Sequence, residues 1–415
     1  MTKKFTERVK EEFSFMRGNF LILIISWVFF NFGFSLTWSF ESPYIRALGA
    51  PPSIIGLMSS IGAAALSLVR IPGAYIADKY GRKQIIATMT FIIAIAALFY
   101  AFAPDWRFVL IGMVISNLCL IYQPALQAIL ADSIPADKRE MGYAAVNVVP
   151  SIPTIVAPAI AGILVMSLGL IPGMRLVYML LFLCSLGAAL TRFFLLKETL
   201  DTPQKIKLGE MKVAFKNSIG SIAEAWREMP RSLKFLTLAL IISSFEDPMW
   251  FLFESLFVFD VVMITELEWG LLNVVFTATM LIFGLGLGKV VHKIGKKRSL
   301  VITYFLLFAP SSILFILSRN FIMLLISNII AGFGFCMANP AFNALQADLI
   351  PKEKRGRIMG TIGTLNILAT IPAAFIGGIL YEINPTTPFI FGITLGLAVG
   401  LLILLTVKEP ETKEA

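Results

Sequence analysis

Long apolar runs separated by short polar loops dominate the chain. A helix needs about 20 apolar residues to cross about 30 Å of hydrocarbon. Twelve runs are long enough, at 19–46, 53–77, 84–103, 107–131, 141–168, 172–196, 233–260, 268–291, 299–318, 321–347, 358–382 and 386–407. The pattern therefore predicts an all-α polytopic membrane protein with twelve transmembrane helices.

One central stretch interrupts this pattern. Residues 198–230 are rich in Lys and Glu and too hydrophilic to span a membrane. Within them, residues 211–229 alternate apolar and charged positions at helical spacing, which predicts an amphipathic helix on the inner membrane surface. The chain thus divides into a six-helix bundle at 1–197, a cytoplasmic linker at 198–231 and a second six-helix bundle at 232–415.

Composition agrees with a membrane protein. The residues AVILMFWYC make up 57% of the chain, charged residues only 15%, and the mean hydropathy is +0.83. Soluble domains have about 45–50% apolar and about 25% charged residues. Cys119, Cys184 and Cys336 all fall inside predicted spans, so we expect neither a disulfide framework nor a metal cluster.

The basic residues predict the orientation. The formal net charge is +9, and Lys and Arg total 35. All of them fall on one side of the predicted membrane except Arg46, Arg70, Arg107, Arg175 and Arg319. Cytoplasmic loops carry the excess of Lys and Arg, so we expect a multi-pass protein of the cell membrane with both termini in the cytoplasm. The positive charge then reflects topology and contact with the lipid bilayer, and nucleic-acid binding is not expected.

A short polar loop between the second and third spans is the most specific motif. It runs from Gly73 through Asp78 to Gly81, Arg82 and Lys83. The charges must lie just outside the hydrocarbon, and Gly81 permits a tight turn with positive φ. The loop resembles the signature G-x-x-x-D-x-x-G-R-K, found at this place in the major facilitator superfamily.

An internal repeat supports this resemblance. Residues 123–139 recur as residues 339–355, with nine of seventeen positions identical. Each copy carries an aspartate, Asp132 or Asp348, followed by Ile-Pro after one residue. Six spans separate the copies, so both run in the same direction through the membrane and the halves are parallel repeats.

The signature loop also recurs, in a degraded form. Gly295 and Lys296 keep the turn glycine and the basic cluster, whereas His292 stands in the place of the aspartate. The resemblance implies that the two loops and the two repeat aspartates form a cytoplasmic gate. We expect Arg82 to pair with Asp132 in this gate.

Two adjacent carboxylates lie deep in the seventh span. Glu246 and Asp247 are about thirteen residues from its start, which is about 20 Å and near the midplane. Two like charges so close cannot both ionise cheaply in a low-dielectric site, and a carboxylate that gains and loses a proton is a simple coupling device. Neighbouring helical residues point about 100° apart, so one of them should face the cavity, and Pro248 favours Asp247. A structural acid that pairs with another helix is the alternative interpretation.

Three further charged residues lie within the spans. The tripeptide Phe-Glu-Ser occurs at both Glu41 and Glu254, 213 residues apart, near the outer ends of the first and seventh spans. We expect these glutamates at an extracellular rim or gate, with simple exposure to outer water as the alternative. Arg70 lies about 12 Å above Asp78, too deep for easy snorkelling, and should face the inner cavity or an acid.

Polar and aromatic side chains on the first and seventh spans complete the set of cavity candidates. These are Asn31, Trp38 and Trp250. Packing against lipid or other helices is the alternative for each.

The resemblance implies a secondary transporter that binds a small solute between two bundles and exposes it alternately to each side. No GxxxxGK[ST] nucleotide loop occurs, so a gradient should drive transport. Because acids and aromatics cluster on the seventh span, the interpretation we favour is proton-linked efflux of a small organic solute by a monomer without cofactor or metal. Uptake or facilitated diffusion of a sugar, organic acid or other nutrient is the rival with the same fold, and a membrane sensor that does not transport is the rival from another class. No catalytic constellation occurs, so an enzyme is not expected.

Overall fold

The computed structural model describes residues 16–79, 81–200, 220, 222–351 and 354–409, and these are helices joined by short turns without any strand. Twelve segments are long and apolar enough to cross a membrane. The prediction of an all-helical, twelve-span membrane protein is therefore confirmed.

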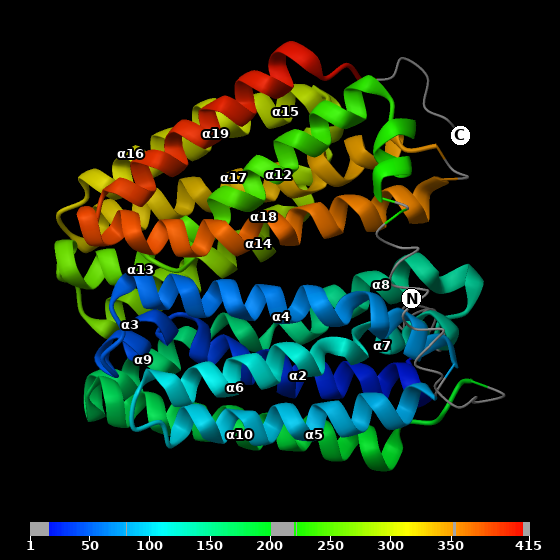
Figure 1. Ribbon diagram of the computed structural model, residues 1–415. Helices are drawn as coiled ribbons and strands as arrows, with labels where there is room; N and C mark the ends of the chain where they lie inside the picture. The colour runs from blue at the N-terminus through cyan, green and yellow to red at the C-terminus, as the bar shows by residue number, and fades with distance from the viewer. Residues whose placement is uncertain (1–15, 80, 201–219, 221, 352–353, 410–415) are drawn as a thin grey trace, which may run out of the picture.

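The helices form two layers (Figure 1). We call the first layer the N-terminal half. Its helices are α2 (Gly18–Trp38), α3 (Glu41–Ala47), α4 (Pro52–Lys79), α5 (Arg82–Ala101), α6 (Trp106–Cys119), α7 (Gln123–Ser133), α8 (Arg139–Val148), α9 (Ala157–Leu168) and α10 (Leu170–Leu195).

The second layer is the C-terminal half. Its helices are α12 (Arg231–Phe251), α13 (Glu254–Phe257), α14 (Glu266–Ile294), α15 (Lys296–Ile302), α16 (Ala309–Leu317), α17 (Phe321–Leu349), α18 (Arg355–Ile383) and α19 (Thr387–Thr406). Of the predicted linker at 198–231, residues 201–219 and 221 lie outside the described residues. Residues 222–228 are helical. Ala225 in this helix and Met229 just after it are buried in the core of the C-terminal half.

The helices of the first and seventh spans are each interrupted, whereas the pattern of apolar residues predicted continuous helices. The helix predicted at 19–46 stops at Trp38 and restarts at Glu41, and the helix predicted at 233–260 stops at Phe251 and restarts at Glu254. Phe40 and Phe253 occupy the two breaks and are fully buried. Their rings stack on Phe259 and Tyr381 respectively, so tertiary packing stabilises breaks that a hydropathy profile cannot register.

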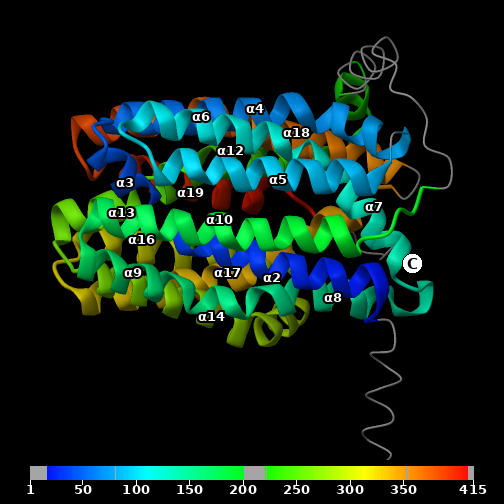
Figure 2. The ribbon, with the colours of Figure 1, turned by 90° about the horizontal axis from the view of Figure 1, so that it is seen from below.

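The two halves touch along α4 with α18 and along α9 with α14 (Figures 1 and 2). Glycines allow close approach there: a Cβ at Gly56 would collide with the carbonyl of Ala374, and one at Gly162 would lie 2.7 Å from the carbonyl of Glu266. These contacts lie far from the ends of the helices that carry the loops at 82–83, 138–139, 296–298 and 354–357. We call that end of the molecule the basic end, and the other the opposite end.

Polar contacts between the halves follow the same distribution. Between described residues they lie towards the opposite end, and join Arg46 to Asp260, Ser53 to Glu382, Ser60 to Ile371 and Ser39 to Trp269. The described polar contacts between the halves are thus concentrated towards the opposite end.

Candidate functional site

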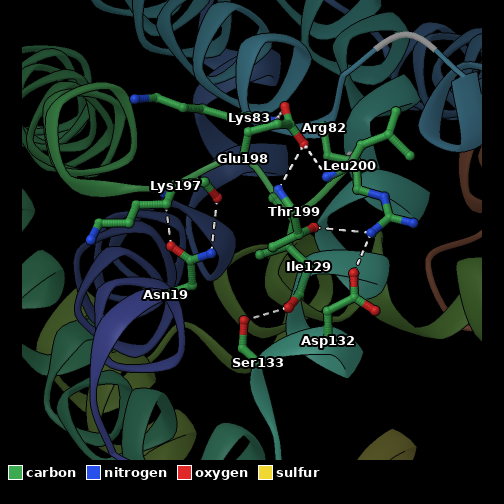
Figure 3. Close-up of polar contacts among 10 residues, drawn as sticks. All are labelled: Asn19, Arg82, Lys83, Ile129, Asp132, Ser133, Lys197, Glu198, Thr199 and Leu200. Atoms are coloured by element: carbon green, nitrogen blue, oxygen red, sulfur yellow. Dashed lines mark hydrogen bonds and ion pairs between the residues drawn. The ribbon is translucent and has the colours of Figure 1, made fainter. Parts of the chain in front are cut away.

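The signature loop forms a compact polar cluster in the N-terminal half (Figure 3). Gly81 has φ +112°, a conformation that favours glycine, and it turns the chain from α4 into α5. The Arg82 guanidinium then forms an ion pair with Asp132 at the end of α7 and donates to the Thr199 hydroxyl at 3.0 Å. The expected pair of Arg82 with Asp132 is confirmed as a contact.

Glu198 closes this cluster. Its carboxylate accepts hydrogen bonds from the backbone N–H groups of Lys83 at 2.9 Å and of Thr199 and Leu200 at 3.0 Å (Figure 3). It therefore caps the start of α5, where orphan N–H groups favour an anion. Burial alone would raise the pKa of Glu198, but the backbone N–H groups outweigh it and lower the pKa.

The C-terminal half repeats the arrangement. Gly295 has φ +101°, Lys296 pairs with Asp348, and the backbone N–H of Lys297 donates to Glu409. We call Asn19, Arg82, Asp132, Lys197 and Glu198 the N-terminal staple. Its counterpart, the C-terminal staple, consists of Ser232, Lys296, Asp348, Lys408 and Glu409.

Sequence reasoning missed the two glutamates of the staples. A signal was present, because the dipeptide Lys-Glu follows the last helix of each half, at Lys197-Glu198 and at Lys408-Glu409. The amide of Asn19 pairs with the backbone of Lys197 at 2.9 and 2.8 Å, and Ser232 accepts from the backbone N–H of Lys408 at 3.2 Å.

Both staples join helices within one half. The side chain of Asp78 lies outside the described residues, so its expected contact with the opposite half stays a prediction. Gly73 lies so close to the carbonyl of Ile121 that a Cβ would collide with it, which couples α4 to the turn before α7. Lys83 contributes its backbone N–H.

A polar and aromatic cavity of about 440 Å³ lies between the halves. We call it cavity 1. It contains four residues singled out from sequence, Asn31, Trp38, Trp250 and Glu254. Amides and hydroxyls supply most of its remaining polar lining, among them Ser35, Thr154, Asn273, Thr277 and Asn328. Such a mixture of aromatic and hydrogen-bonding groups is typical of a small-molecule site.

A second cavity, of about 400 Å³, lies beside the first, and we call it cavity 2. Residues of α4, α5, α6 and α10 line most of it, together with Glu41. Phe34, Trp38 and Phe251 line both cavities and form the wall that they share. Glu41 and Glu254 are half-buried, each in the lining of a cavity, and their expected place at an extracellular rim or gate stays a prediction.

Glu246 and Asp247 point in different directions. Glu246 faces α19, with its carboxylate oxygens 3.4 Å from the place of a Cβ on Gly396, so this acid packs within its own half. Asp247 is exposed. It lies three and four residues before Trp250 and Phe251 in α12, so it shares their face, one turn nearer the basic end. Neither acid lines cavity 1 or 2, but Asp247 lies on the same helix face as Trp250 and Phe251, which line cavity 1.

Arg70 lies on the corresponding face of α4. It is four residues beyond Leu66, which lines cavity 2, and its side chain is exposed. Its guanidinium lies 3.4 Å from the place of a Cβ on Gly363 in α18. The expected position towards the space between the halves fits this geometry, whereas an acid partner for Arg70 does not occur among the described residues.

Arg192 lies in the last turn of α10, inside the span predicted at 172–196, and from the sequence we counted it with the basic residues of one side. Its side chain is fully buried in the N-terminal half and donates to the hydroxyls of Ser26 at 3.1 Å, Thr90 at 2.8 Å and Tyr122 at 3.4 Å. Its guanidinium also lies 5.6 Å from the ring centroid of Phe30. A basic residue near the end of a predicted span cannot be assigned to loop or interior without the packing of its neighbours.

Comparison with known proteins identifies the family. The sequence model described as Major Facilitator Superfamily matches residues 23–269 and 236–415. The chain belongs to the major facilitator superfamily and is a transporter, not an enzyme.

Two curated bacterial proteins are similar over part of the chain. The Quinolone resistance protein NorA of Staphylococcus aureus (strain Mu50 / ATCC 700699) is 27% identical over 148 residues, which is 36% of this chain and 38% of that protein. The Multidrug resistance protein 1 of Bacillus subtilis (strain 168) is 30% identical over 142 residues, 34% of this chain and 36% of that protein. The aligned stretches thus span less than two fifths of these relatives.

Solved structures show the same fold. The nucleoside transporter NupG superposes with a TM-score of 0.74 at 14% identity, covering 94% of this chain and 98% of that chain. The peptide transporter POT in complex with sulfate has a TM-score of 0.72 at 16% identity and 93% coverage of both chains. At such identities the likeness concerns the fold alone.

Proposed function

We propose that this transporter exports an organic cation in exchange for protons. One observation carries the proposal: the lining of cavities 1 and 2 includes the carboxylates Glu41 and Glu254 and several aromatic rings, but no Lys, Arg or His among the described residues. An ionised carboxylate without a counter-charge is costly away from water, so a bound cation offsets that cost. Aromatic faces such as those of Trp38 and Trp250 attract cations as well.

Asp247 is the proposed coupling residue. It lies on the face of α12 that carries Trp250 and Phe251, one turn nearer the basic end. A proton or a cationic solute can neutralise it, and the two then compete for one carboxylate. Because they compete, the binding of one releases the other. When the site is exposed alternately to the two sides of the membrane, this competition exchanges a proton for the solute.

Orientation and state complete the proposal. The basic end faces the cytoplasm of the cell, because Lys and Arg concentrate there. The two bundles at 1–197 and 232–415 rock about the site as units, with the linker at 198–231 between them. One chain supplies both cavities, so a monomer suffices, and the partial similarity to resistance proteins favours export.

The test uses purified protein in liposomes with the membrane potential clamped. N-methyl-4-phenylpyridinium, an aromatic monocation, should accumulate at least about 10-fold in vesicles whose interior is more acidic than the bath. Asp247→Asn should abolish this accumulation and spare exchange of labelled for unlabelled cation. Glu246→Gln, the adjacent acid that faces α19, should retain accumulation within about twofold.

Two results would reject parts of the proposal. Equilibration that ignores the pH gradient would favour facilitated diffusion, and an unaffected Asp247→Asn variant would exclude this residue as the coupling group. A protein that moves no cation but moves a sugar, organic acid or peptide would make nutrient uptake the better assignment.

A further inference from the structure

The two cavities contain carboxylates that are related by the internal repeat. Glu41 begins α3 and Glu254 begins α13, each directly after the break in the first helix of its half. Glu41 lines cavity 2 and Glu254 lines cavity 1. Each cavity therefore has one anionic group, at equivalent positions of the two halves.

The two carboxylates belong to neighbouring helices. Helices α3 and α13 contact each other across the boundary between the halves. Between the two cavities stands the shared wall of Phe34, Trp38 and Phe251, which is apolar and aromatic.

Cavity 2 also contains a polar group without a partner. The hydroxyl of Tyr178 is buried and forms no hydrogen bond, and Tyr178 lines this cavity with Glu41 and Tyr100. Buried polar groups are normally satisfied, so an orphan hydroxyl beside a carboxylate indicates a place that a polar guest occupies. Tyr100 and Tyr178 are stacked at a centroid distance of 4.8 Å and add aromatic surface for a cation.

From this arrangement we infer that cavities 1 and 2 together bind one organic solute that carries two cationic centres joined by an apolar chain. One centre lies beside Glu254 and Trp250 in cavity 1, and the other beside Glu41 and the tyrosines of cavity 2. The chain between the centres packs along Phe34, Trp38 and Phe251. Joining two weak sites through one ligand raises affinity because the second contact is intramolecular. The inference rests on the proposed export of cations and specifies their class.

The test compares matched ligands by calorimetry on purified protein in detergent. The probes are α,ω-bis(trimethylammonium)alkanes of increasing chain length and the monocationic alkyltrimethylammonium of each length. All are permanently charged, so pH does not change the ligand. Within the bis series affinity should peak at one chain length, and there the bis-cation should bind at least about 10-fold more tightly than its monocation.

Variants assign the second centre. Glu41→Gln should remove the advantage of the bis-cation and change monocation affinity less than about twofold. Ala63→Leu, which narrows cavity 2 and keeps Glu41, should do the same and covers the case in which Glu41→Gln does not fold. Asp105→Asn is the matched control: it removes one negative charge outside both cavities and keeps an N-cap of α6, so both affinities should stay unchanged.

The outcomes separate this inference from the proposed function. Equal affinities for bis- and monocations, or a Glu41→Gln variant that weakens both alike, would overturn the two-centre site. If N-methyl-4-phenylpyridinium still accumulates in liposomes in that case, cation export stands alone. If neither ligand class binds and no cation moves, the proposed function fails as well.

Discussion

The two halves of this transporter have matching staples at the basic end and differ in their interiors. At the basic end, both halves have a turn glycine and a cation–aspartate pair. In both, a glutamate after the last helix accepts a hydrogen bond from the start of the third span, which is α5 in one half and α15 in the other. Inside, the N-terminal half buries a cation, Arg192, whereas the C-terminal half packs a carboxyl group, that of Glu246, against α19.

The interiors differ position by position. By the repeat, Ile403 stands where the other half has Arg192, and Tyr304 stands where it has Thr90. The hydroxyl of Tyr304 lies 2.7 Å from that of Ser243, whereas Thr90 accepts a hydrogen bond from Arg192. Of these two pairs of positions, the large polar side chain comes from the last span in the N-terminal half and from the third span in the C-terminal half.

This difference shows which positions a repeated fold constrains. A staple must meet a fixed backbone geometry, because it joins helix ends whose N–H and C=O groups need partners. An interior needs only complementary volumes and satisfied polar groups, and several residue sets meet that requirement. The interior is therefore free to diverge while the scaffold stays the same.

The largest expected effect concerns Arg192. Arg192→Ala should lower the free energy of unfolding by about 2–5 kcal/mol, because it leaves a cavity in the N-terminal half. Arg192→Met keeps the volume and should cost less than about 1.5 kcal/mol, since Ser26 and Thr90 still donate to backbone carbonyls. Denaturant unfolding in detergent measures both. A Met variant as unstable as the Ala variant would show that the hydrogen bonds of Arg192, and not its volume, hold this interior together.

Substitution of the turn glycines tests whether the basic ends of the two halves are equivalent. Gly81→Ala and Gly295→Ala should each cost about 1–2 kcal/mol, because φ is +112° and +101° at these positions. The same unfolding assay should place the two variants within about 0.5 kcal/mol of each other. A clear difference between them would mean that the staples, despite their matching contacts, do not support the two halves equally.

The ion pairs of the staples should be less important for stability. Arg82→Ala and Lys296→Ala should each cost about 0.2–1 kcal/mol, because their aspartates are 46% and 26% exposed. Arg82 should cost the more of the two, since it also bonds Thr199. Thermal unfolding at low and high salt checks this order. If Lys296→Ala proves the more damaging, the added bond to Thr199 has no energetic role.

The smallest effect is a pH dependence at Glu198. Its pKa in the folded protein is below the ordinary 4.5, so its contribution to stability is present above about pH 4.5 and is lost as the pH falls through the lower folded value. The midpoint of thermal unfolding should then decline more steeply in acid for the wild-type protein than for Glu198→Gln, by a few degrees at most. Parallel profiles of the two proteins would remove Glu198 from the groups that link stability to pH.

Much of this protein could be predicted from one-dimensional patterns. Apolar runs of sufficient length determined the twelve spans, and the copies at 123–139 and 339–355 determined the parallel repeat. The pair of Arg82 with Asp132 was also predictable, because both residues lie in motifs at helix ends whose side is set by the count of spans. Helix ends and membrane sides depend on local sequence and on the need to keep charge out of hydrocarbon.

Only the tertiary structure decided where side chains in the middle of a helix point. Glu246 and Asp247 are neighbours in sequence, yet one packs on α19 and the other shares a face with Trp250 and Phe251, and Arg192 lies in the core although it was counted with the basic residues of the loops. The breaks at Phe40 and Phe253 and the pairing of Glu198 with the start of α5 likewise depend on residues far away in the chain. In a chain that is apolar on all sides, hydrophobicity cannot orient a helix about its axis, so close packing between helices makes that choice.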